Sequence, residues 1–191
     1  AKQNQGLNNS GGLLTGPQTG ELAFALPYEG LTAKLGKRFI KGHEQFDEIW
    51  VLAPAPGVWG LGPTFNEANC VGCHPNNSRA QPAKSGAEIE KGNVVKFGYR
   101  QASGEVIPAH PWYGDQLQNR AAENRVPMEG NAVVTYEKSI FKYPDETVIK
   151  LKRPIISVKN LNFGNLDEST LVSMRIAPQV IGLGILEWVP D

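Results

Sequence analysis

The chain has 191 residues, which is enough for one domain of ordinary size with its own hydrophobic core. Its 19 basic and 19 acidic residues cancel, so the charge balance does not indicate a nucleic-acid-binding protein or a basic membrane-surface protein. No apolar run is long enough to span a bilayer, while 21 glycines and 14 prolines predict a loop-rich chain.

The N-terminal part is expected to hold little regular structure. Residues 1–20 are rich in Gly, Asn, Gln and Ser, which predicts a flexible arm, and they lack a charged and apolar leader, so we expect any signal peptide to have been removed. Apolar positions in residues 21–50 predict short helices. Residues 51–64 contain too many prolines and glycines for regular structure, and Thr64 is a suitable N-cap for a short helix leading into the next motif.

That motif is the most informative part of the sequence. The only two cysteines and one of three histidines form the pentapeptide Cys70-Val71-Gly72-Cys73-His74. This C-x-x-C-H spacing is that of covalent haem c attachment. Two thiols on one helical turn can form thioethers with the porphyrin vinyl groups, and the adjoining imidazole can bind the iron as proximal ligand. The sequence therefore predicts one covalent haem held by Cys70, Cys73 and His74.

Other roles of a C-x-x-C pair fit the surroundings less well. A disulfide across two residues would be strained, and a thioredoxin-like pair would follow an apolar strand, which residues 62–69 do not resemble. A tetrahedral zinc site needs two more Cys or His ligands, but His43 and His110 are distant in the sequence. Because haem c is attached after export, we expect a periplasmic or extracellular protein.

The second half begins with a polar loop and then changes to a β-prone region. Residues 75–91 are polar and predict a surface loop. Two β-prone runs flank the turn-like residues 142–146, so residues 131–158 are expected to form a β-hairpin or small sheet.

The C-terminal region is expected to be helical. The apolar spacing in residues 165–191 predicts one helix capped by Asp167 and a second that starts at Pro178. The fold class predicted from the sequence is therefore mainly α, loop-rich and cytochrome c-like. Residues 21–191 would form a single haem domain with a β-rich insertion at 131–158.

Three segments in this order resemble one protein family. They are residues 60–66 running into the C-x-x-C-H motif, residues 113–118 followed by Glu129-Gly130, and residues 175–187. Together they resemble the di-haem oxidoreductases of the peroxidase type, also described as thiol-oxidoreductase-like. These are relatives of the bacterial di-haem cytochrome c peroxidases and of the di-haem enzymes that mature methylamine dehydrogenase. The resemblance covers residues 40–190.

The sequence departs from this family in one respect. Members carry a second C-x-x-C-H motif in their C-terminal half, whereas this sequence has one. The chain would therefore correspond to the N-terminal, first-haem part of such a protein, or to a mono-haem relative. The expected partner is a redox protein or a second haem domain, with self-association as a further alternative.

The sixth ligand of the iron would decide between electron transfer and catalysis. His110 as ligand would give a low-potential bis-imidazole haem, whereas Met128 or Met174 would give a higher potential. Each has an ordinary alternative, because His110 lies in a loop where it need not touch the iron and methionines usually fill cores. His43 is flanked by charge and is expected in solvent.

An open iron would instead permit peroxide chemistry, which needs a group that moves a proton and polar donors that help to break the O–O bond. In the related peroxidases a glutamine and a glutamate line the distal pocket, so the resemblance implies this role for Gln118 and Glu129, with Gln116 as second choice. The alternative is that these residues only fasten loops. Arg175 is a candidate partner of the haem propionates, since a guanidinium pairs well with carboxylates; an ion pair with Asp167 or Glu168 is the alternative.

The sequence thus predicts an exported c-type cytochrome domain that carries out redox chemistry or electron transfer at one covalent haem. Whether it is an enzyme stays open between a peroxidase-type oxidoreductase and a non-catalytic electron carrier that assembles with itself or with a partner chain. A sensor that binds a small gas at an open iron is a third alternative. Neither nucleic acid nor a membrane span is expected.

Overall fold

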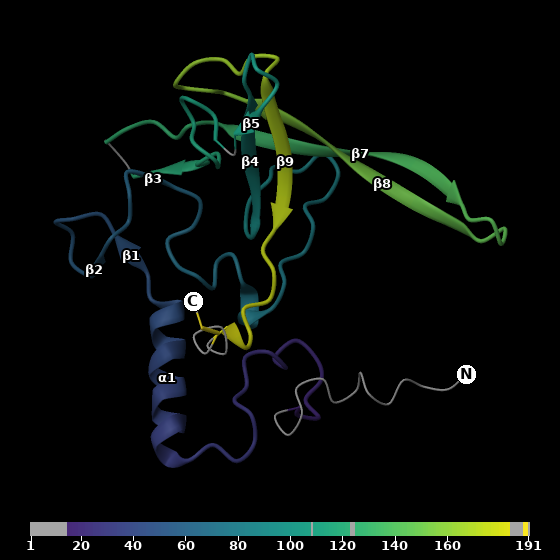
Figure 1. Cartoon of the computed structure of the whole chain (residues 1–191). Helices are drawn as coiled ribbons and strands as arrows, with labels where there is room; N and C mark the ends of the chain where they lie inside the picture. Colours follow the sequence, from purple (N-terminus) through teal and green to yellow (C-terminus); the bar gives the residue numbers. More distant parts are fainter. Residues whose placement is uncertain (1–14, 108, 123–124, 184–188, 191) are drawn as a thin grey trace.

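The structure is a computed structural model that describes residues 15–107, 109–122, 125–183 and 189–190. Antiparallel strands dominate it (Figure 1). Strands account for 32% and helices for 11% of the described residues. The expected mainly α, cytochrome c-like fold is therefore wrong, and the described structure is mainly β. Residues 1–14 of the predicted N-terminal arm lie outside the described residues.

The central sheet has three strands in the order β5-β4-β9. They are β5 (Val106–Ile107), β4 (Asn93–Arg100) and β9 (Thr170–Ile176), and β4 is antiparallel to both neighbours. The helix expected from Asp167 is therefore wrong. The apolar side chains of residues 170–176 alternate with a period of two when they pair with β4, and this long-range pairing overrides the helical reading of the same residues.

The predicted β-hairpin is confirmed. Strands β7 (Asn131–Lys142) and β8 (Val148–Lys159) pair antiparallel along their whole length, and Tyr143 N donates to Thr147 O at 2.8 Å across the turn. The base of the hairpin packs into the core, whereas its outer part extends away from the body of the molecule (Figure 1). A two-stranded ribbon of this kind depends on the core at its base for stability.

The hydrophobic core is small and lies between one face of the central sheet and the base of the hairpin. Alternate residues of β4 enter it, as the burial of Asn93, Val95 and Phe97 shows. The buried apolar cluster is formed by Ile89, Val95, Phe97, Tyr113, Leu117, Ala132 and Val134. The opposite face of β4, which carries Val94 and Lys96, is left for other contacts.

The N-terminal half surrounds this core with short elements. The α-helix α1 (Ala33–Asp47) confirms helical structure within residues 21–50; Thr32 Oγ1 caps it by accepting from Leu35 N at 3.4 Å. It is followed by β1 (Trp50–Val51) and β2 (Val58–Trp59), which pair in parallel, and by β3 (Thr64–Phe65), which pairs with β6 (Arg120–Ala121).

Two further expectations for helices are wrong. Thr64 begins strand β3 and does not cap a helix, because its backbone pairs with Ala121. Residues 178–182, which follow β9, contain no helix, so the expected second helix does not start at Pro178; residues 184–188 of that expected helix lie outside the described residues. The chain after the C-x-x-C-H motif forms a 3-10 turn, η2 (Pro75–Asn77), within the predicted loop. In the described ranges, we find no helix with the length and apolarity required to cross a bilayer.

Candidate haem-binding site

The C-x-x-C-H motif forms one tight turn. His74 N donates to Cys70 O at 3.0 Å, and Cys73 N donates to the same oxygen at 3.1 Å. Asn69 Oδ1 accepts from Gly72 N at 3.0 Å and caps the start of the turn. Both cysteines are free thiols, with Cys70 exposed and Cys73 partly buried. The two thiols and the imidazole therefore come from a single turn, as the spacing predicts.

The imidazole of His74 is held by the C-terminal part of the chain. Its Nδ1 lies 2.7 Å from the carbonyl oxygen of Pro178. A carbonyl can only accept, so Nδ1 carries a proton, and in the neutral ring Nε2 therefore keeps its lone pair. An imidazole whose second nitrogen is fixed by a backbone carbonyl is the usual arrangement of a metal-binding histidine.

Backbone hydrogen bonds fix Pro178 next to the motif. Ala177 accepts from Ala80 N at 3.0 Å and donates to Gly92 O at 2.7 Å, and Val180 N donates to Asn77 O at 3.0 Å. The segment that follows β9 is thus attached on both sides of Pro178. The carbonyl of Pro178 is therefore held in position by backbone hydrogen bonds on both sides.

A partly buried ion pair supports the other side of the turn. Arg120 Nη1 lies 3.0 Å from Glu67 Oε2, and the Glu67 side chain is only 13% exposed. Burial raises the pKa of the Cys73 thiol, and a hydrogen bond with the Gly92 backbone opposes this effect. The neutral thiol is therefore the resting form of Cys73 near neutral pH.

An open cleft of about 390 Å³ lies beside the motif, a volume within the range of small-molecule sites. Gln116 and Gln118 lie in its wall, so the structure brings these two predicted residues to Cys70, Cys73 and His74. Gln116 Nε2 donates to Asn66 Oδ1, and Asn66 Nδ2 donates to Leu117 O at 2.8 Å. The cleft is lined by Thr64, Phe65, Asn66, Glu67, Asn69, Cys70, Cys73, His74, Val94, Gln116 and Gln118.

Glu129 lies behind this wall and does not line the cleft. Its Oε2 accepts from Gln118 N at 2.7 Å, and its own backbone N donates to Gln118 O at 3.0 Å. The carboxylate therefore holds the backbone that presents Gln118. Burial raises the pKa of Glu129, and the hydrogen bond from Gln118 N opposes the rise.

This raised pKa gives a pH dependence that can be measured. The contribution of Glu129 to the free energy of unfolding is complete below the ordinary pKa of 4.5 and is lost as the pH rises through the higher pKa of the folded state. We expect Glu129→Gln, which keeps an acceptor oxygen, to remove that part of the pH dependence. Urea unfolding at several pH values between 4 and 7 tests this. If the free energy of unfolding of the variant changed with pH as steeply as that of the parent, the prediction would be contradicted.

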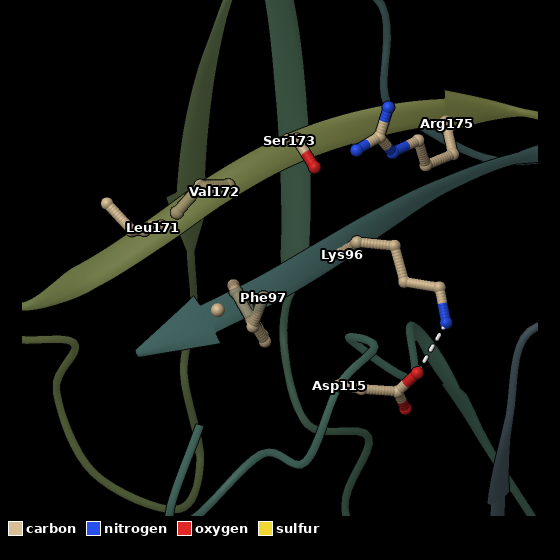
Figure 2. A pocket seen from close by; sticks show the side chains of 8 residues that line it. Lys96, Phe97, Asp115, Leu171, Val172, Ser173 and Arg175 are labelled. Carbon is tan, nitrogen blue, oxygen red and sulfur yellow. Dashed lines mark hydrogen bonds and ion pairs between the residues drawn. The ribbon is translucent and has the colours of Figure 1, made fainter. Parts of the chain in front are cut away.

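Arg175 and Lys96 lie on the same face of the central sheet as Val94, because Arg175 pairs with Val94 and Ser173 pairs with Lys96. They line a shallow cavity of about 440 Å³ next to the cleft (Figure 2). Lys96 Nζ lies 2.6 Å from Asp115 Oδ2, and this hydrogen bond lowers the pKa of Asp115.

The guanidinium of Arg175 takes part in none of the salt bridges formed by the described residues. Neither Asp167 nor Glu168, the two alternative partners, pairs with it in the part of the chain that the structure describes. Asp167 instead accepts from Ser169 N at 2.9 Å and from Tyr99 OH at 3.3 Å. Arg175 therefore presents a free positive charge on the sheet face that leads to the cleft.

The candidate distal ligands lie elsewhere. His110 is 3% exposed and packs among the rings of Phe97, Tyr99 and Tyr113, and its Nδ1 accepts from Trp112 N at 3.2 Å. None of His110, Met128 and Met174 lines the cleft as the structure describes it.

The two methionines occupy different settings. Met174 packs against the hydrophobic core on the other face of β9, and the Met128 carbonyl accepts from Asn162 Nδ2 at 2.8 Å. His43 lies on α1, where it is partly exposed and its Nε2 is 3.6 Å from Asp47 Oδ2. Its ring stacks on Phe39, with 6.3 Å between the ring centroids.

Sequence reasoning missed Pro178, Asn66, Gly92 and Lys96. Pro178 acts through its backbone carbonyl, for which the sequence carries no side-chain signal. Asn66 and Pro178 do fall within the segments that carry the family resemblance, and this was the one signal that pointed to them. Gly92 matters because its φ is +85° and its backbone meets Cys73.

No three His, Cys, Asp or Glu side chains of the described ranges are grouped so that they could together hold a metal ion. We compared the chain with models of known protein families, with curated proteins and with solved structures, and none of the three comparisons gave a significant match.

Proposed function

We propose that this chain is an exported c-type cytochrome domain that performs redox chemistry or electron transfer at one haem bound covalently by Cys70 and Cys73. The contact of His74 Nδ1 with Pro178 O at 2.7 Å carries the proposal, because it leaves Nε2 available next to two free thiols on the same turn. When bound, the haem supplies one-electron chemistry at its iron.

The residues present fit this group. Cys70 and Cys73 would anchor it, and His74 would provide a nitrogen ligand for the iron, with its tautomer set by Pro178. The porphyrin brings its own four nitrogen ligands, so a larger set of protein ligands is not required. Arg175, whose positive charge is not neutralised on the face next to the cleft, is the proposed partner of the propionates.

The resemblance to the first-haem part of the di-haem peroxidase-type oxidoreductases supports the same proposal. Gln116 and Gln118, which it singles out, lie in the wall of the cleft. Glu129 would act there through the position of Gln118, because its carboxylate accepts from the Gln118 backbone. Under this proposal Glu129 is a positioning residue.

An optical spectrum with and without carbon monoxide tests the proposal. We expect a haem spectrum whose main band shifts when carbon monoxide is added to the reduced protein, because none of His110, Met128 and Met174 lines the cleft in the described structure. A purified protein without a haem spectrum would contradict the function. A haem spectrum that carbon monoxide leaves unchanged would instead show a sixth protein ligand and favour a pure electron carrier.

A second candidate is a cytochrome that assembles with copies of itself, and the exposed surface favours it. The outer half of the hairpin exposes the apolar side chains of Ile140, Phe141, Val148 and Leu151. Among the described residues, strands β7 and β8 pair there only with each other, so each has an unpaired edge. Exposed apolar side chains on a ribbon with unpaired edges are typical of a surface that associates with another chain.

We expect the assembling form to elute well above 20.8 kDa, plus one haem, in size-exclusion chromatography with light scattering. The proportion of the larger species should increase with protein concentration. Elution at the monomer mass at every concentration would rule this candidate out.

A further inference from the structure

A concave surface on the other face of β9 takes no part in the proposed haem site. It lies between β9, the hairpin and residues 82–85, and encloses about 690 Å³. Met174 and Ile176 of β9 point to this side, whereas Arg175 between them points to the haem side. The lining consists of Pro82, Ala83, Lys84, Ser85, Tyr136, Lys138, Lys152, Pro154, Met174 and Ile176.

The floor of this cavity is apolar and its wall is held in place. Met174 and Ile176 are partly buried and form the floor with Pro154 and Ala83. Tyr136 OH donates to Ala83 O at 2.9 Å, which ties the hairpin to the loop at residues 82–85. The cavity is therefore preformed, and an occupant would meet an apolar surface that is already ordered.

The charged side chains that line the cavity are lysines. Among the described lining residues, the charged ones are Lys84, Lys138 and Lys152, and no lining residue in that set carries a carboxylate. None of these lysines belongs to a salt bridge of the described residues. Lys138 and Lys152 are direct cross-strand partners in the hairpin. Like charges at directly opposite positions destabilise a strand pair, so the fold keeps a repulsion here that a bound anion would relieve.

We propose that this cavity binds a small amphipathic anion. Its apolar body would rest on Met174 and Ile176, and its acidic head, a carboxylate or sulfonate, would lie between Lys138 and Lys152. The volume lies in the range of small-molecule sites, and the concave floor suits a small ligand better than the surface of a protein. The proposal is independent of the haem, since no residue of the C-x-x-C-H motif lines this cavity.

The test uses NMR of the two methionine methyl groups, with isotope-labelled Met174 as the reporter and Met128 as an internal control. The probe is anilinonaphthalene sulfonate, added to the reduced, purified protein. We expect the Met174 signal to shift with saturation at one probe per chain and the Met128 signal to stay in place. A Met174 signal that does not move would overturn the proposal.

The contribution of the charges is tested with Lys138→Gln combined with Lys152→Gln. We expect the probe to bind about tenfold more weakly to this variant, whose fold should be intact because a repulsive pair has been removed. The control, Lys150→Gln with Lys159→Gln, changes the same charge on β8 outside the cavity and should leave the affinity unchanged.

The matching neutral amine, phenylnaphthylamine, should bind the parent protein about tenfold more weakly than the sulfonate. Equal affinity of the parent and the Lys138→Gln, Lys152→Gln variant for the sulfonate would mean adventitious binding to exposed apolar surface only. Equal affinity of the parent for the charged and neutral probes would mean the same. Either result would overturn the proposal.

Discussion

Replacement of both cysteines, in the variant Cys70→Ser with Cys73→Ser, should abolish covalent haem incorporation. A serine hydroxyl cannot form the thioether that links the protein to the porphyrin, and the open cleft beside His74 offers little enclosure to hold a haem without a covalent bond. For this experiment the chain is expressed with a signal peptide in cells that also produce a haem c attachment system. Haem staining after denaturing electrophoresis and a pyridine haemochrome assay then measure the covalent fraction, which should fall from nearly one per chain to none.

The control for this experiment is His43→Ala. It removes another histidine, on α1, but leaves the C-x-x-C-H turn intact, so the covalent haem content should equal that of the parent. Each single serine variant keeps one thioether site and should retain part of the haem. A parent chain that acquires no haem, or a double variant that stains as strongly as the parent, would refute the proposed function.

The second large effect is expected at Gly92. A Cβ atom at this position would lie 2.5 Å from the carbonyl oxygen of Cys73 and would also overlap the Cβ of Ala80. In addition, its φ of +85° lies in the left-handed region that disfavours side chains. Steric overlap with backbone and the strained φ together should make Gly92→Ala less stable by about 3 kcal/mol in urea unfolding.

Gly86→Ala is the matched control. Gly86 has a φ of +82°, yet no heavy atom lies within 4 Å of the position of an added Cβ. This variant should lose about 1 kcal/mol, the cost of the backbone conformation alone. The difference between the two variants measures the contact of Gly92 with the Cys73 turn. Equal losses would show that the chain accommodates a Cβ at position 92, and would contradict the steric role of Gly92.

The parts of the fold that were predicted correctly depend on local residues. The C-x-x-C-H turn forms within five positions, and the hairpin at residues 131–158 has β-prone runs on both sides of a turn-like segment. The central sheet was not predicted, because β4 pairs with β9 across a long stretch of chain. Residues 170–176 have apolar positions that suit a helix as well as a strand, and only the partner strand decides between them.

At the candidate site, too, individual residues could be predicted from the sequence, whereas their contacts with distant residues could not. Gln116 and Gln118 were identified through the family resemblance, and the structure places them in the cleft with His74. The role of Glu129 was left open between catalysis and the fastening of a loop, and its carboxylate binds the backbone of Gln118. The packing of His110 against Phe97 and Tyr99 was not foreseeable, since these two rings come from β4, whereas Tyr113 belongs to the same loop as His110.

The hydrogen bond between His74 and Pro178 joins residues 104 positions apart. The hydrogen bonds of the turn that carries the thiols come from the turn itself and from the preceding Asn69, whereas the carbonyl partner of the imidazole lies on the segment that follows β9, which is placed by pairing with β4. Closing so long a loop is a slow, non-local step. Under the proposed function, covalent attachment of the haem and positioning of its histidine ligand would therefore be separate events in maturation, and the second would require the pairing of β4 with β9.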